Sequence, residues 1–422
     1  MAYVKVKEAI IESLSAIDKR VLCAIYWHRC LTAPLAYTYF YSKKYKKPQY
    51  AARKFAAMQA WGLIEPVEYT AEDPAFFLTT LGIKTVQFLM GISDVDQERL
   101  MKKSKDIKMH PQNINHQMHL TEFALMFMDR AGKTIPYEYK DEKFMDRYVS
   151  IRPDGLIELE KYSIFLEMDM GTEATVDLMK KWVNYREFLT SGKFYNQKKP
   201  IVVLFILQNV RNVELRRKTV LKTIGKALLD CMGPKFDIYI DAPEQLLQTL
   251  FDKYILEDGA YNDHMHEIRG ALRSHGFSLS SGDVAKSFTS GTTYPFYARK
   301  LNPQKKIVSQ DGQPQEYFID TFFLRPASVL RNAFHHCGCL SEMKMKLGRK
   351  IPLVIFVPDE EILISDLKVL GELFTEDTFF VSLKRLSNNC FYEALFQIDK
   401  AGNLSHFSDY SLKQREFERK IS

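Results

Sequence analysis

The chain has 422 residues, of which 46% are hydrophobic and 26% are charged, so it is long and apolar enough for two or three globular domains. Its formal net charge of +7 is mildly basic and permits an anionic partner. The N-terminal residues lack the apolar segment of a signal peptide, and no apolar run is long enough to span a bilayer. The six scattered cysteines do not form the pattern of a disulfide framework, and we therefore expect a reduced, cytoplasmic protein.

The N-terminal domain, residues 1–98, is predicted to consist of helices followed by a β-hairpin. Apolar residues recur at helical spacing over 17–27 and 49–61, and a short helix is expected between these two segments. The stretches 63–69 and 74–78 are expected to form the two strands of the hairpin. Three helices and a hairpin are the order of a winged helix, whose third helix usually enters the major groove of DNA.

Cationic residues gather at the start of the third predicted helix, with tyrosines between them. Cations in this position contact phosphates and set the register of a protein on DNA without reading its sequence. We therefore predict a DNA-binding face, and the alternative is the solvated surface of a protein-docking winged helix. This basic cluster consists of Lys43, Lys44, Lys46, Lys47, Arg53 and Lys54.

Two α/β domains are predicted to follow a polar, basic linker over residues 99–115. In the second domain, 116–252, the pattern predicts a helix, three strands, a helix, a strand, a helix and a strand. The C-terminal domain, 253–422, shows part of the same order, with strands expected over 316–324 and 353–357, and could be a degenerate copy of the second domain. The expected fold class is α/β with an N-terminal helical domain.

A group of carboxylates is the strongest chemical signal in the second domain. Asp154 lies in an Arg-Pro-Asp-Gly turn, and an apolar strand further along carries Glu167 and Asp169. Alternate residues of a strand point to one face, so Glu167 and Asp169 project together, and a turn could bring Asp154 beside them. Because converging carboxylates repel one another, we predict that these three residues bind Mg²⁺ or Mn²⁺ and are catalytic. The alternative is that the acids are solvated at a turn and a strand end.

The helix expected over 172–189 adds further candidate catalytic residues. Glu173 lies in its first turn, where the helix dipole favours an anion, and Lys180 and Lys181 lie further along its polar side. A metal with a nearby lysine suits phosphodiester hydrolysis, because the metal activates water and the lysine stabilises the transition state. The alternative is a solvated helix face on which Asp177 and Lys181 form a weak ion pair.

An Asp followed by an apolar strand with a Glu resembles the PD-(D/E)xK nuclease superfamily. Together with the winged helix, His116, the Arg-Pro-Asp-Gly turn and the segment 165–173, it more closely resembles the replication-relaxation family of plasmids and conjugative elements. That family is similar to MobC-type relaxases, and the resemblance ends near Leu250. It implies that the second domain, 116–252, has a restriction-endonuclease-like fold and that His116 is an accessory active-site residue.

The resemblance also implies the metal site of Asp154, Glu167 and Asp169, with one departure. Asp169 stands where the nuclease pattern has a catalytic lysine. Either Lys180 or Lys181 replaces that lysine from the following helix, or the site binds metal without efficient cleavage.

We therefore expect a DNA-binding protein of a plasmid or other mobile element that acts in replication, or in DNA relaxation and mobilisation, through a metal-dependent nicking site. The alternative is a non-catalytic replication initiator or regulator that uses an inactive nuclease fold as a scaffold. The expected cofactor is Mg²⁺ or Mn²⁺. The expected partners are double-stranded DNA and other replication or conjugation proteins; a homodimer is left open, and no membrane partner is expected.

Overall fold

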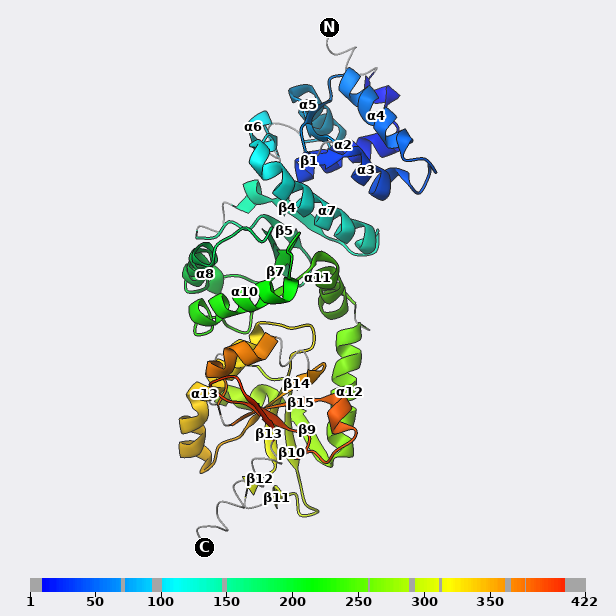
Figure 1. Ribbon diagram of the computed structural model, residues 1–422. Helices are drawn as coiled ribbons and strands as arrows, with labels where there is room; N and C mark the ends of the chain where they lie inside the picture. The colour runs from blue at the N-terminus through cyan, green and yellow to red at the C-terminus, as the bar shows by residue number, and fades with distance from the viewer. Residues whose placement is uncertain are drawn as a thin grey trace. The chain divides into compact units, whose positions relative to one another are not determined.

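The computed structural model describes residues 10–69, 73–92, 101–145, 150–256, 259–287, 293–310, 313–360, 366–375 and 377–406 (Figure 1). The chain is α/β, which confirms the predicted fold class at this level. It forms two compact units, Met1–Met170 and Gly171–Ser422, and their boundary falls within the domain predicted over 116–252. No helix in the described part of the chain is long and apolar enough to cross a bilayer.

The first unit begins with helices and a small antiparallel sheet whose strand order is β1-β3-β2. The expected helices and hairpin are present, and the short strand β1 joins them because its three residues are buried against β3. These elements are α2 (Ala16–His28), β1 (Cys30–Thr32), α3 (Ala33–Ala36), η1 (Tyr37–Tyr41), α4 (Gln49–Ala60), β2 (Ile64–Val67), β3 (Ala75–Leu78) and α5 (Thr80–Leu89).

Local hydrogen bonds define where the N-terminal helices begin and end. Ser15 accepts a hydrogen bond from the N–H of Asp18, and the Asp18 carboxylate accepts one from Ser15 in return, which forms a capping box for α2. The Thr32 hydroxyl caps α3 in the same way by accepting from Leu35. Gly62 follows α4 with φ +68°, a conformation that glycine adopts without strain, and it turns the chain into β2.

A longer helix and a three-stranded antiparallel meander complete the first unit. Ile114, Met118 and Leu125 of the long helix α7 pack into the core of the N-terminal helices. Strand β5 pairs with both β4 and β6. The segment predicted as a linker contains two short helical turns, and its Lys102 is buried. These elements are α6 (Ser104–Ile107), η3 (Pro111–Asn113), α7 (Ile114–Ala131), β4 (Glu138–Asp141), η4 (Glu142–Met145), β5 (Gly155–Glu158) and β6 (Ser163–Asp169).

The second unit starts with helices that alternate with two parallel strands. All seven residues of β7 are buried, as expected for a parallel strand, and β7 pairs in parallel with β8. Helices α8 and α10 pack against each other, and the indole N–H of Trp182 donates to the Thr223 hydroxyl between them. These elements are α8 (Thr175–Leu189), α9 (Gly192–Tyr195), β7 (Ile201–Leu207), α10 (Val213–Ala227), β8 (Phe236–Asp241), α11 (Pro243–Leu250) and η5 (Phe251–Ile255).

A mixed sheet with strand order β17-β16-β15-β14-β13-β10-β9 forms the rest of the second unit. Strands β9, β10 and β13 are antiparallel neighbours, whereas β13, β14 and β15 run parallel. Helices α12 and α13 flank this sheet (Figure 1), and α12 packs into its core through Ile268 and Leu272.

The elements around the mixed sheet are α12 (Ala260–Ser274), β9 (Phe277–Ser281), η6 (Gly282–Ser287), β10 (Phe296–Lys300), β11 (Ser309–Gln310), β12 (Gln313–Pro314), β13 (Glu316–Thr321), α13 (Ser328–Leu347), β14 (Leu353–Val357), η8 (Lys368–Leu373), β15 (Thr378–Ser382), α15 (Leu383–Leu386), β16 (Phe396–Ile398) and β17 (Leu404–His406). The order from α12 to β15 is helix, three sheet strands, helix, strand, helical turn and strand, apart from the turn η6 and the small β11–β12 hairpin. The order from α7 to β8 is similar, with the full helix α10 in place of the helical turn and with the short turns η4 and α9 added.

Candidate functional site

Two predicted carboxylates lie on neighbouring strands of the first unit. Gly155 pairs with Leu166, and the N–H of Asp154 donates to the carbonyl oxygen of Leu166 at 2.9 Å. The backbone of Asp154 therefore lies beside Leu166, at the point where the pairing of β5 with β6 ends. Asp169 lies two residues beyond Glu167 on β6 and shares its face by alternation. The hairpin therefore brings Asp154 next to the backbone of the strand that carries Glu167 and Asp169.

The backbone of Met168 joins Asp154 to His116. The Oδ2 atom of Asp154 accepts a hydrogen bond from the N–H of Met168 at 2.8 Å. His116 reaches the same residue from α7, with its Nε2 atom 3.2 Å from the carbonyl oxygen of Met168 and 3.3 Å from Oδ2 of Asp154. A carbonyl oxygen can only accept, so Nε2 of His116 is the donor in this contact. The structure thus brings His116 to Asp154, in the segment between Glu167 and Asp169.

The acids of β6 are deeply buried. Glu167 is 4% exposed and Asp169 is 0% exposed, whereas the Asp154 side chain is 24% exposed. A carboxylate kept away from water needs a compensating positive group, proton or hydrogen bonds, because its desolvation costs several kcal/mol.

The carboxylate oxygens of Asp154 and Glu167 suit a hard cation in their chemistry, and the imidazole of His116 lies beside Asp154. In the parts of the chain that the structure describes, no three His, Cys, Asp or Glu side chains are grouped closely enough to hold a metal ion. Mg²⁺ often binds through one or two carboxylates, completed by water and substrate phosphate. Asp154 and Glu167 could supply two such ligands; the three-carboxylate site stays a prediction.

Tyr139 is a neighbour of this site that sequence reasoning did not single out. Its hydroxyl is buried without a hydrogen-bond partner among the described residues. A side chain added at Gly155 would come within 3.2 Å of that hydroxyl. Burial, and then the carboxylates of Asp141 and Asp154, raise the pKa of Tyr139 well above its usual value. No local pattern signals this contact, because it depends on the pairing of β4 with β5.

Three further predicted residues belong to the second unit. Lys181 pairs with Glu173, with 3.2 Å between Nζ and Oε1, and its Nζ lies 5.2 Å from the centre of the Phe205 ring. Lys180 is exposed and pairs with Asp177 at 3.3 Å. The ion pair that the sequence suggested between Asp177 and Lys181 is therefore replaced by two pairs, because Lys181 turns towards Glu173 at the start of the helix.

Most of the basic cluster is exposed, as a nucleic-acid interface requires. Lys44, Lys46, Lys47 and Arg53 lie on the surface of the segment that leads into α4 and on its first turns. Lys43 is also exposed, and its Nζ pairs with Asp129 at 2.7 Å. An exposed pair of this kind is weak and can be exchanged for a phosphate contact.

Lys54 differs from the rest of the basic cluster because it neutralises a buried acid. Its Nζ lies 2.8 Å from Oδ2 of Asp18, whose side chain is 1% exposed. The hydroxyl of Tyr41 donates to the other oxygen of Asp18 at 2.7 Å. These hydrogen bonds keep the pKa of Asp18 below its usual value despite burial, which raises it. Lys54 therefore supports the start of α2 and is less available to a phosphate.

Residues 22–204 match the model of the replication-relaxation family. This region runs from within α2 to within β7 and includes Asp154, Glu167 and Asp169. The match confirms the family predicted from the sequence motifs and supports a role in the replication or relaxation of a plasmid or other mobile element. The chain matches no curated protein and no solved structure.

Proposed function

We propose that this protein binds the double-stranded DNA of a plasmid or other mobile element and nicks it at a metal-dependent site built around Asp154 and Glu167. The observation that carries the proposal is the hydrogen-bonded arrangement of Asp154, Met168 and His116 at the strand that also carries the buried Glu167. Membership of the replication-relaxation family over 22–204 supports the same role.

The N-terminal elements are proposed to form a winged helix that binds DNA. Their chain order, α2, β1, α3, α4, β2 and β3, with the sheet order β1-β3-β2, supports this fold. Helix α4 would then be the recognition helix, with exposed cations at its entry to contact phosphates. Tyr45 and Tyr50 stack at 3.6 Å between ring centres and stiffen this surface.

Asp154 and Glu167 would hold the divalent cation, with Asp169 as the predicted third acid. When bound, such a cation lowers the pKa of its water and neutralises charge on the scissile phosphate. The contact from His116 to Asp154 and Met168 would orient the carboxylate, which makes His116 a positioning residue. Glu173 and either Lys180 or Lys181 are proposed as supporting residues on the strength of the sequence alone.

The test is nicking of supercoiled plasmid that carries its cognate origin, in the presence of Mg²⁺ or Mn²⁺. The wild-type protein should convert it to the relaxed form, and Glu167→Gln should not, because it loses a metal-binding charge. Glu160→Gln is the matched control: it makes the same change at an exposed acid outside the carboxylate face, and it should nick like the wild type. Equal nicking by wild type and Glu167→Gln would refute the proposed site.

A second candidate function is a non-catalytic DNA-binding initiator or regulator. Asp169 favours it, because a buried acid stands where the nuclease pattern has a lysine. The nuclease-like domain would then be an inactive scaffold, and the C-terminal domain, whose β13 has Glu316 and Asp320 but no Glu-x-Asp, would be a degenerate copy of it. Origin binding without nicking, and with no effect of Glu167→Gln on any DNA reaction, would favour this function.

A further inference from the structure

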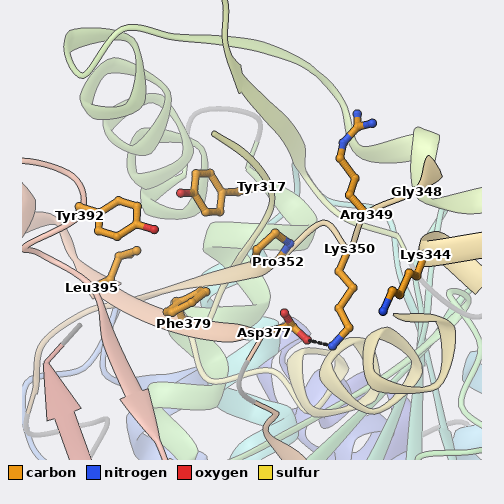
Figure 2. A pocket seen from close by; sticks show the side chains of 10 residues that line it. All are labelled: Tyr317, Lys344, Gly348, Arg349, Lys350, Pro352, Asp377, Phe379, Tyr392 and Leu395. Atoms are coloured by element: carbon orange, nitrogen blue, oxygen red, sulfur yellow. Dashed lines mark hydrogen bonds and ion pairs between the residues drawn. The ribbon is translucent and has the colours of Figure 1, made fainter. Parts of the chain in front are cut away.

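The second unit contains a cavity of about 460 Å³ that has no part in the site described above. Figure 2 shows that its wall has two chemically different halves. Aromatic side chains line one half, and cationic side chains line the other, with Pro352 between them. The aromatic residues are Tyr317, Phe379 and Tyr392, and the cationic residues are Lys344, Arg349 and Lys350.

The cavity lies at the amino ends of three parallel strands. Tyr317 is the second residue of β13, and Lys350 and Asp377 lie just before β14 and β15. Asp320 lies towards the other end of β13. The cavity is therefore separate from the place in this domain that would correspond to the carboxylate cluster.

Two cations of the cavity are held in place by acids. Lys350 pairs with Asp377 at 2.9 Å, as Figure 2 shows. The guanidinium of Arg349 binds both carboxylate oxygens of Glu316, with 3.2 Å between Nη2 and Oε2. Glu316 is fully buried on β13, so this bidentate contact fixes the Arg349 guanidinium against the sheet. Side chains ordered in advance lose little entropy when a ligand binds.

Lys344 supplies the charge that these pairs do not neutralise. It is exposed on the last turn of α13 and makes no ion pair with any residue in the described part of the chain. Gly348 ends α13 with φ +70° and donates its N–H to the carbonyl oxygen of Lys344 at 2.9 Å. This left-handed turn brings Arg349 and Lys350 back beside Lys344. The three cationic side chains together offer several N–H donors to an anion.

The aromatic half is a platform suited to a flat ring. Tyr317 and Phe379 are buried, with 5% and 7% of their surface exposed, and Tyr392 is half-buried in the segment before β16, so Tyr392 is the most accessible of the three rings. Tyr317 packs against Phe391, with 5.2 Å between ring centres, which anchors this segment to the sheet. Aromatic side chains stack on nucleic-acid bases of any type.

We propose that this cavity binds a nucleotide, with the base against the aromatic half and the phosphate on Lys344 and Lys350. Its volume falls in the range of small-molecule sites, which is roughly 300–1,000 Å³. A stacking surface next to a cationic one matches the two ends of a nucleotide, whereas an inorganic anion would leave the aromatic half unused. The nucleotide is either a unit of single-stranded DNA or a free nucleotide, and the site does not depend on the nicking proposed above.

The experiment measures the binding of a short, fluorescently labelled oligothymidylate to the full-length protein by fluorescence anisotropy. Tyr392→Ala should weaken binding by roughly tenfold or more, because one stacked base contributes about 1–3 kcal/mol. Tyr392→Phe keeps the ring and should bind like the wild type. Lys344→Met should also weaken binding, and the matched control Lys346→Met, at a lysine outside the cavity that pairs with Glu342, should not.

Competition with thymidine 5′-monophosphate distinguishes a site for a free nucleotide from a site for a DNA strand. Displacement of the oligonucleotide by the monophosphate supports a site for a free nucleotide, and its failure supports a site for a DNA strand. Binding of a labelled duplex of the same length measures the affinity of the proposed N-terminal DNA-binding surface. This affinity should be the same for the wild type and all the variants. Oligothymidylate affinity that is unchanged in both Tyr392→Ala and Lys344→Met, or a wild-type protein that binds neither probe, would overturn the proposal.

Discussion

The carboxylate of Asp154 accepts a hydrogen bond from the N–H of Met168 at 2.8 Å, and this bond ties the start of β5 to the end of β6. The hydrogen bond therefore fixes the position of the Asp154 side chain relative to the two strands of the hairpin. Asp154→Ala leaves the N–H of Met168 without its acceptor and should lower the free energy of unfolding by roughly 1–3 kcal/mol. Asp154→Asn keeps an acceptor oxygen and should cost less. Urea denaturation checks this, and equal losses in the two variants would show that the hydrogen bond is unimportant.

Charge reversal in the basic cluster should abolish most duplex binding. Changing Lys43, Lys44, Lys46 and Lys47 to Glu replaces attraction to phosphates by repulsion. The slope of log affinity against log salt should fall by about 0.9 for each phosphate that the protein no longer neutralises. The measurement is anisotropy of a labelled origin duplex over a range of salt concentrations.

The control for this experiment carries the same change in net charge in the second unit, at four exposed lysines. It should bind the duplex much more tightly than the N-terminal variant does. These lysines are Lys193, Lys198, Lys222 and Lys226. Duplex affinity that survives reversal of the basic cluster would exclude α4 as the DNA-binding element.

Lys102 should be essential for the stability of the first unit. Its ammonium donates to the carbonyl oxygen of Tyr26 at 2.8 Å and to the carboxylate of Asp141, and all of it is buried. Burial lowers the pKa of Lys102, although Asp141 opposes this shift. Lys102→Met leaves the Asp141 charge buried alone and should destabilise by roughly 3–5 kcal/mol.

The paired change Lys102→Met with Asp141→Leu should recover part of that loss, because it removes both buried charges. Lys105→Met, at an exposed lysine of the same segment, should have little effect. Urea unfolding followed by tryptophan fluorescence measures all three. A Lys102→Met protein as stable as the wild type would contradict the buried ion pair.

The sequence predicted the strand that carries Glu167 better than it predicted the C-terminal sheet. The strand that carries Glu167 was predictable because its apolar run is continuous, and β6 is buried at every position. Strands β9 and β10 were not predicted, since serines interrupt the alternation in β9 and the pairing partners lie far along the chain. Helix α13 runs from Ser328 through Gly338 to Leu347, because Cys339 and Met343 continue its buried face past the glycine.

Buried histidines should make the protein less stable in weak acid. His336 is fully buried, and this burial lowers its pKa to about 3, against about 6.5 in the unfolded chain. Above pH 6.5 the imidazole of His336 is neutral in both the folded and the unfolded chain, so it does not change the free energy of unfolding. As the pH falls towards 3, this imidazole binds a proton in the unfolded chain but not in the folded one, and stability is lost. Near pH 5 the loss from this residue is about 2 kcal/mol.

His336→Gln removes this titration and retains a polar group for the hydroxyl of Tyr294, which lies 3.3 Å from Nδ1 of His336. The drop in unfolding free energy between pH 7 and pH 5 should therefore be about 2 kcal/mol smaller in the variant than in the wild type. Denaturation curves at the two pH values provide the comparison. An identical drop in both proteins would mean that His336 takes up its proton without unfolding.

Calorimetric titration of the full-length protein with Mn²⁺ tests most directly whether Asp154 and Glu167 form a cation site. The account predicts a binding isotherm for the wild type that Asp154→Asn and Glu167→Gln each weaken strongly, with the exposed-acid variant Glu160→Gln unchanged. Asp154→Asn is preferred to Asp154→Ala here because it removes the charge and keeps an acceptor for Met168. A wild type that binds no Mn²⁺, or one whose binding survives both substitutions, would contradict the account.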